Sequence, residues 1–116
     1  MSGGESTRKN ERLEIFGEML GEVMVYEPMA VRVISRGGAL IETSCPLVVD
    51  SLHDFRLMLG NISVVVKGRI VHSHVSELEQ GGVIYRVGIE FVQPTDHVLE
   101  AITQFMAAIV AGREIT

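Results

Sequence analysis

Apolar and polar side chains alternate around a glycine pair, and this feature constrains the fold more than any other. Residues 31–43 read V-R-V-I-S-R-G-G-A-L-I-E-T, which predicts two strands joined by a tight turn at Gly37-Gly38. Successive side chains of an extended chain point to opposite faces. The first strand should therefore have two faces: Val31, Val33 and Ser35 on one, and Arg32, Ile34 and Arg36 on the other. The turn glycines can adopt positive φ angles and let a ligand approach the backbone.

Other segments show the same alternation. Residues 54–59 and 62–74 flank Gly60-Asn61, a dipeptide typical of a two-residue hairpin loop. Residues 22–26 predict a first strand and residues 83–92 a last one. One face of each strand should collect the alternating set: Phe55, Leu57 and Leu59 in residues 54–59, and Val64, Val66, Gly68 and Ile70 in residues 62–74. In the last strand the inward-facing set should be Val83, Tyr85, Val87, Ile89 and Phe91.

The remaining segments are less regular. Residues 44–53, with Pro46, predict a connection with a short edge element, and residues 77–82 predict a polar loop. Residues 13–20 fit either a short amphipathic helix or a broken strand. About six antiparallel strands joined by hairpins can hide their edges by closing into a small barrel, so a barrel is the expected architecture.

A helix is expected after Pro94, with Thr95 or Asp96 as its N-cap and an end near Gly112. Its apolar residues recur at helical spacing: Leu99, Ile102, Phe105, Met106 and Ile109. We expect this apolar face either to plug an open side of the barrel or to pair with a second subunit in a homodimer.

The composition fits one small domain with a local basic site. At 116 residues, 47% of them apolar, the chain can fill a single core. The net charge of −5 argues against DNA or RNA as a partner, because a duplex binder needs a basic excess. Half of the 10 Lys and Arg residues nevertheless fall in two short segments: Arg8, Lys9 and Arg12 in one, and Arg32 and Arg36 in the other. Such a site suits a small anionic ligand.

The sequence also bears on the compartment. The single cysteine, Cys45, excludes an internal disulfide and fits a reducing environment. No apolar run reaches the roughly 18 residues of a membrane span, and residues 1–7 lack the apolar core of a signal peptide. We therefore expect a cytoplasmic protein without a membrane span.

Two motifs in this chain resemble the signatures of the PilZ domain family. Residues 33–39, V-I-S-R-G-G-A, are similar to the D/N-x-S-x-x-G signature, with Ser35 and Gly38 in the matching positions. Residues 8–12, R-K-N-E-R, match the family's upstream R-x-x-x-R signature. Residues 85–91, Y-R-V-G-I-E-F, look like the family's last barrel strand, so the resemblance spans roughly residues 8–111.

The resemblance implies an all-β domain, a small six-stranded antiparallel barrel with a C-terminal helix. It divides the chain into a flexible N-terminal arm (residues 1–12), a barrel (residues 13–93) and the helix (residues 94–112). It also implies that the domain is a receptor for cyclic di-GMP, a bacterial second messenger, and needs no further cofactor. Ligand binding would fold the arm down over the barrel.

The resemblance assigns the ligand contacts to four residues: Arg8, Arg12, Ser35 and Gly38. Arginine can bond the O6 and N7 edge of guanine or clamp a phosphate, and a serine hydroxyl can donate to either. Arg32 and Arg36 lie outside the signatures and are candidates for extra charge only. Val33 departs from the motif, since the family has Asp or Asn there. Valine cannot accept hydrogen bonds from the guanine N–H groups, and leaving these groups unpaired costs about 1–3 kcal/mol of binding free energy.

Two functions follow from this resemblance. In the first, the domain reports the cyclic di-GMP level to an unidentified effector protein that regulates motility or biofilm formation. In the second, the barrel has lost the nucleotide, as Val33 suggests, and acts as a protein–protein interaction module. That module would dock through the terminal helix or residues 47–52.

We do not expect an enzyme or a metal site. His72 and His74 share a strand face but lack a further ligand at metal-binding spacing. Ser51 and His53, with Asp50 and Asp54, superficially resemble a hydrolytic set, but no nucleophile elbow surrounds the serine.

Overall fold

The computed structural model describes residues 11–23, 27–79 and 82–115. Its strands and helix, in chain order, are β1 (Arg12–Glu14), β2 (Leu20–Val23), β3 (Glu27–Ser35), β4 (Gly38–Thr43), β5 (Leu52–Leu59), β6 (Ile62–Glu79), β7 (Gly82–Phe91) and α2 (Asp96–Ile115). The arginine of the upstream motif at position 8 lies outside the described residues, and so does most of the predicted arm.

The sheet closes on itself. Its strands follow the order β1-β3-β2-β5-β6-β7-β4, and β3 also pairs with β4, so six of the seven strands form a closed antiparallel barrel. The remaining strand, β1, pairs with the end of β3. The prediction of a small six-stranded barrel with a C-terminal helix is therefore confirmed. Closure is favourable because it pairs the backbone groups that an open sheet would leave unpaired at its edges.

The barrel interior is filled by branched and aromatic side chains. The largest fully buried ones are Phe55, Ile34, Ile41, Leu57, Ile70, Ile102, Val31 and Val87. The residues predicted to share a face of β5 and of β6 are all buried, and the last three inward positions predicted for β7 are confirmed. Val83 and Tyr85 are only half-buried: Val83 lies where β6 and β7 run on together as a two-stranded hairpin, and Tyr85 lies opposite Thr43 at the last position of β4.

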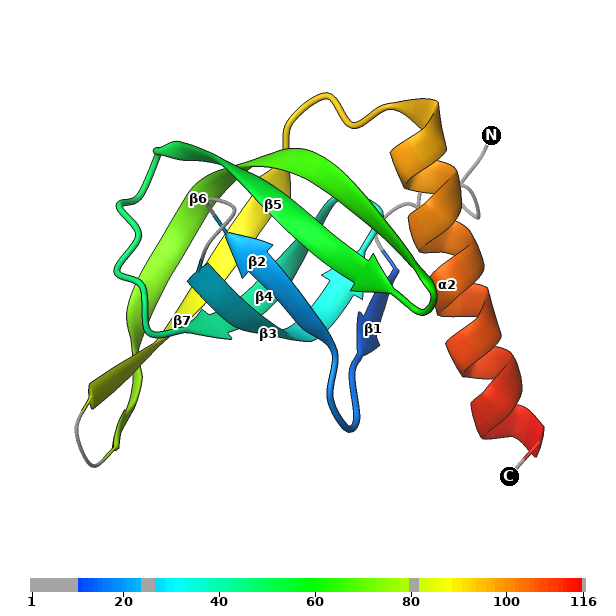
Figure 1. Ribbon diagram of the computed structural model, residues 1–116, viewed down its shortest axis with the longest axis horizontal. Coiled ribbons are helices and arrows are strands. Elements are labelled where there is room, and N and C mark those ends of the chain that lie inside the picture. Colours follow the sequence, from blue (N-terminus) through cyan, green and yellow to red (C-terminus); the bar gives the residue numbers. More distant parts are fainter. Residues whose placement is uncertain (1–10, 24–26, 80–81, 116) are drawn as a thin grey trace.

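The helix α2 packs against β5 and β6. Figure 1 shows it standing beside the barrel, on the side opposite the tip of the β6–β7 hairpin. Ile102 is fully buried in this contact, and Val98 and Met106 nearly so, so the apolar face of the helix packs onto the barrel. The Thr95 hydroxyl accepts a hydrogen bond from the Val98 amide at 3.2 Å, which identifies Thr95 as the N-cap. The helix runs through Gly112, where we expected its end.

A bulge in β3 corrects the predicted faces of that strand. The register against β4 shifts between Val31 and Val33, so one extra residue enters β3 at this point. Val31 and Ile34 are both fully buried as a result, although strict alternation had placed them on opposite faces. Two strands pair with the same edge of β3, one on each side of the bulge: β1 pairs with residues 33–35 and β2 with residues 27–30.

Other strand boundaries also differ from the prediction, and β3 begins at Glu27 instead of Val31. β5 begins at Leu52 and β2 at Leu20, each two residues earlier than expected. β6 extends to Glu79 and β7 begins at Gly82, so most of the predicted 77–82 loop is strand. The hairpin loop at Gly60 is confirmed, and its φ angle of 70° explains the glycine. Within the described residues, no helix is long and apolar enough to cross a membrane.

Candidate functional site

A hollow of about 430 Å³ opens where β3 turns into β4. It is lined by residues of four strands and the turn: Arg12, Ser35, Gly37, Gly38, Ala39, Ile89 and Glu90. The volume lies in the range of small-ligand sites, roughly 300–1,000 Å³. The hollow therefore combines one cation, one hydroxyl and one carboxylate over a floor of small and apolar residues.

Arg12 reaches this hollow through the register of β1. In the antiparallel pairing of β1 with β3, Arg12 lies directly opposite Ser35. The Ile15 amide donates to the Arg32 carbonyl at 2.8 Å and so continues the pairing beyond β1. The second arginine of the upstream motif is thus fixed by main-chain hydrogen bonds beside the serine of the downstream motif, although 23 positions separate them in the chain.

Ser35 organises the turn itself. Its hydroxyl oxygen accepts hydrogen bonds from the amides of Gly37 and Gly38, both at 3.2 Å, and lies 3.3 Å from the Gly38 carbonyl oxygen, to which it donates. A hydroxyl bonded to the backbone two and three residues on is the usual serine turn. The side chain consequently has a fixed position at the rim of the hollow.

Gly38 is required by packing. A Cβ atom at this position would lie 2.1 Å from the Ile89 carbonyl oxygen, far inside van der Waals contact. The turn does not use the positive φ angles that Gly37 and Gly38 permit, because among the described glycines such angles occur at Gly17 and Gly60. Gly38 instead lets β4 approach β7 closely, which leaves a flat backbone floor in the hollow.

Glu90 is a lining residue that the sequence analysis missed. It lies opposite Gly38 in the β4–β7 pairing and opposite Arg69 in the β6–β7 pairing. Arg69 Nη2 donates to Glu90 Oε1 at 2.8 Å, and the Glu90 side chain remains 53% exposed. The only sign of it in the sequence was its position between Ile89 and Phe91, which face inward, so that its own side chain should face outward.

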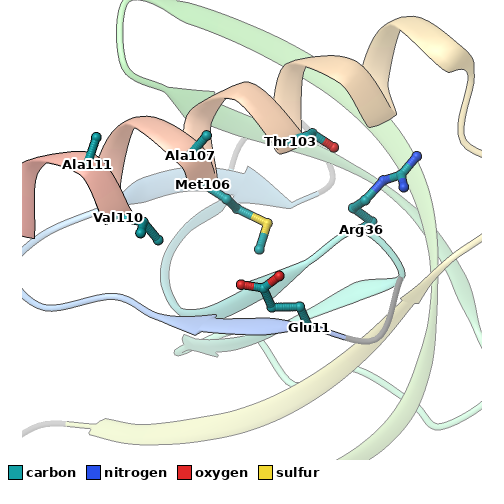
Figure 2. A pocket seen from close by; sticks show the side chains of 7 residues that line it. All are labelled: Glu11, Arg36, Thr103, Met106, Ala107, Val110 and Ala111. Carbon is teal, nitrogen blue, oxygen red and sulfur yellow. The ribbon is translucent and has the colours of Figure 1, made fainter. Parts of the chain in front are cut away.

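Two predicted site residues line other hollows. Arg36 borders a space of about 300 Å³ under α2 together with Glu11, Thr103 and Met106 (Figure 2). Its buried Nε atom has no hydrogen-bond partner among the described residues. Val33 borders a third hollow with Glu14 and Leu40, its neighbours on the adjoining strands. Neither residue lines the hollow that holds Arg12 and Ser35.

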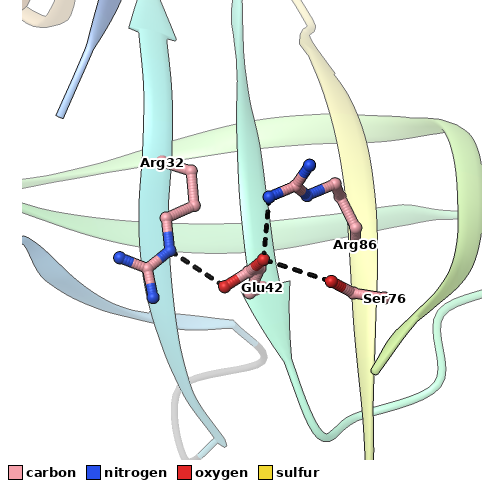
Figure 3. Close-up of polar contacts among 4 residues, drawn as sticks. All are labelled: Arg32, Glu42, Ser76 and Arg86. Carbon is pink, nitrogen blue, oxygen red and sulfur yellow. Dashed lines mark hydrogen bonds and ion pairs between the residues drawn. The ribbon is translucent and has the colours of Figure 1, made fainter. Parts of the chain in front are cut away.

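Arg32 belongs to a separate polar cluster on the barrel wall (Figure 3). Its Nε donates to Glu42 Oε1 at 2.9 Å, and Arg86 Nη2 donates to Glu42 Oε2 at 3.0 Å. The Ser76 hydroxyl also donates to Oε2 at 3.3 Å. Burial acts to raise the pKa of Glu42, but the hydrogen bonds from the two arginines outweigh it and hold this pKa below its ordinary value of 4.5.

The remaining polar candidates have structural partners. His72 and His74 stack with ring centroids 5.9 Å apart, and the ring of His72 lies where a side chain at Gly88 would stand. The described residues contain no group of three side chains able to hold a metal ion. Ser51 lies 2.8 Å from His53 Nε2, but its hydroxyl donates to the Val48 carbonyl, so the histidine is not placed to take that proton.

The comparisons agree with this fold. The model of the PilZ domain family matches residues 7–108, and the chain therefore belongs to the PilZ domain family. The solved PilZ domain of YcgR from Escherichia coli, with c-di-GMP, superposes with a TM-score of 0.73 at 9% identity and covers 89% of this chain and 91% of its own. A comparison with curated protein sequences found no match.

MrkH of K. pneumonia has the same fold. One of its crystal structures superposes with a TM-score of 0.75 at 16% identity over 93% of this chain, and its c-di-GMP complex with a TM-score of 0.70 at 14% identity over 90%. This chain spans about half of the MrkH chain, 52% in both structures.

Proposed function

We propose that this chain is a receptor domain for cyclic di-GMP that works by binding and not by catalysis. One observation supports this function above the others: β-strand register places Arg12 opposite Ser35, beside Gly38 and over a single hollow. These residues belong to the two motifs that resemble the ligand signatures of the family. The solved structures of YcgR and MrkH with c-di-GMP have the same fold.

The chemistry of the hollow suits a guanine dinucleotide. Arg12 provides a planar fork that can bond a guanine edge or a phosphate. Ser35 provides a hydroxyl, and Gly38 leaves the floor free of side chains. Arg8 is proposed as the second fork, reaching the same ligand from the arm of residues 1–12. Arg36 and Val33, which line other hollows, take a minor part or none.

Binding would then be transmitted to an effector protein. In this proposal the part of the arm that precedes β1 closes over the ligand and changes the surface beside the β3–β4 turn. A cytoplasmic partner in motility or biofilm regulation recognises this changed surface. Part of the free energy gained from the ligand contacts offsets the conformational entropy lost when the arm is ordered. The gain in affinity is therefore smaller than the number of contacts suggests.

Isothermal titration calorimetry with cyclic di-GMP tests this function. We expect one saturable transition with a dissociation constant on the order of micromolar, about −8 kcal/mol. Cyclic di-AMP and GTP at equal concentration serve as comparison ligands. The absence of heat and of any shift in melting temperature at millimolar cyclic di-GMP would contradict a receptor function.

A second function is favoured by a different observation. Three apolar side chains in and after the β4–β5 connection are exposed: Val48, Val49 and Leu52. Exposed apolar residues that cluster on a small domain are typical of a protein interface. A nucleotide-free interaction module would use this surface, and it would bind its partner equally well with and without cyclic di-GMP.

A further inference from the structure

We propose that Glu90 selects guanine in the hollow, by accepting N–H groups of the base through its carboxylate. This inference rests on the proposed function and deepens it. It also supplies the acceptor that position 33 lacks, because Val33 can accept no hydrogen bond. Neither of the two signature motifs contains Glu90.

The strand register places Glu90 across the floor from the cationic side. On one side, Arg12 lies opposite Ser35 in the β1–β3 pair. On the other, Glu90 lies opposite Gly38 in the β4–β7 pair. Gly38 has no side chain and has no room for one, so only backbone separates the serine from the carboxylate. A flat ring lying on this floor would meet a guanidinium at one edge and a carboxylate at the other.

Guanine has the matching pattern of edges. Its O6 and N7 atoms accept hydrogen bonds and suit an arginine fork, whereas N1–H and the N2 amino group donate and suit a carboxylate. Adenine carries an acceptor at N1 and no amino group at C2, so a carboxylate facing that edge meets an acceptor and repels it. A cation and a carboxylate on opposite sides of the floor therefore favour guanine over adenine.

Arg69 orients this carboxylate. It binds Oε1 at 2.8 Å, and it offsets the negative charge that would otherwise repel the phosphates of the ligand. No described residue bonds Oε2, which remains available as an acceptor at the hollow. The half-exposed position of Glu90 lets the side chain turn toward a base without breaking the barrel core.

The test is a pair of titrations, with cyclic di-GMP and with cyclic di-AMP, on the intact chain and on Glu90→Gln. We expect Glu90→Gln to weaken cyclic di-GMP binding about 10-fold, because the amide has one acceptor oxygen instead of two and must turn its NH2 donor toward either Arg69 or the guanine N–H groups. Binding of cyclic di-AMP should not weaken. Glu18→Gln is the matched control, since it removes the same charge from an exposed residue between β1 and β2 and should leave both affinities unchanged.

Three outcomes overturn the inference in different ways. Equal gains for both nucleotides in Glu90→Gln would mean that the carboxylate only repels phosphate. Unchanged affinity for cyclic di-GMP, with the wild-type chain binding normally, would remove Glu90 from the site and leave the receptor function intact. A wild-type chain that binds no cyclic di-GMP would reject the receptor function, and this inference with it.

Discussion

The cluster around Glu42 and the hollow at the β3–β4 turn differ in whether the charge of their β3-side arginine, Arg32 or Arg12, is already paired. In the cluster around Glu42, Arg32 and Arg86 share one carboxylate that is only 12% exposed. In the hollow at the β3–β4 turn, no described residue forms an ion pair or hydrogen bond with the Arg12 side chain. The first arrangement stabilises the pairing of β3, β4 and β7, and the second leaves a cation available for a ligand.

This difference shows why counting arginines does not locate a site. Arg12 is exposed, the Arg32 side chain is 42% exposed, and the two lie near each other along the same strand pair, so they contribute similarly to any count of charge. Their partners separate them. A guanidinium that already binds a carboxylate gains little from a phosphate, whereas an unpaired one beside a hollow gains a full charge-assisted hydrogen bond.

The largest effect is expected at the floor that the hollow shares with the core. Gly38→Val places a side chain against the Ile89 carbonyl, so β4 and β7 must separate, and we expect a loss of about 3 kcal/mol in the free energy of unfolding. Urea denaturation measures this loss. Gly37→Val is the control, because a Cβ atom at position 37 would meet only the Ser35 hydroxyl oxygen at 4.0 Å. Equal losses in the two variants would contradict the packing role of Gly38.

The next effect is expected in the cluster around Glu42 and not in the hollow. Glu42→Gln removes the carboxylate from two arginines and should cost about 2 kcal/mol of unfolding free energy at pH 7. The folded-state pKa of Glu42 is lowered, so its contribution is present above pH 4.5 and is lost as the pH falls through that lowered value. The difference between wild type and variant should therefore shrink on acidification. A difference that grows at low pH would contradict this account, and cyclic di-GMP affinity should not change.

A smaller effect is expected at the rim of the hollow at the β3–β4 turn. Ser35→Ala removes the acceptor of two turn amides and so loosens the rim of the hollow, and affinity for cyclic di-GMP should fall about 10-fold, or about 1.4 kcal/mol. Calorimetry measures the loss. Ser76→Ala, which removes a hydroxyl from the paired cluster, should leave affinity unchanged. Equal losses in both variants would remove the distinction between the two regions.

The smallest effect is expected at Val33. The departure from the family motif suggested that Val33→Asp would tighten binding, but Val33 lines a neighbouring hollow beside Glu14. Since Glu90 is proposed to supply the carboxylate, we expect affinity to change by less than about 5-fold, which is below 1 kcal/mol. A larger gain in a calorimetric titration would show that the ligand extends over position 33 and would return the family role to this residue.

The sequence predicted the barrel well where alternation is unbroken. Phe55, Leu57 and Ile70 are buried as expected, because β5 and the first part of β6 contain no extra residue. It failed in β3, where the bulge at Val31–Val33 reverses the faces and no glycine or proline marks the place. It also failed at the end of α2, where Gly112 continues the helix.

The candidate site was predicted in part for the same reason. The motifs identified Arg12, Ser35 and Gly38, and the structure brings these three to one hollow. Arg36 and Val33 are adjacent in sequence to that hollow but face other spaces. Glu90 could not be found from the sequence, because a glutamate at an outward strand position looks like ordinary solvated surface. Only the non-local register of β4 with β7 places it opposite Gly38.

The most direct test of the central claim compares one arginine from each region. Calorimetric titration of cyclic di-GMP into Arg12→Ala and Arg32→Ala exchanges the same side chain for the same replacement, once beside the hollow and once in the paired cluster. We predict that Arg12→Ala loses at least about 30-fold in affinity, or about 2 kcal/mol, as expected for a charge-assisted hydrogen bond, and that Arg32→Ala binds like wild type. Wild-type affinity in Arg12→Ala, or a matching loss in Arg32→Ala, would contradict the assignment of the ligand to this hollow.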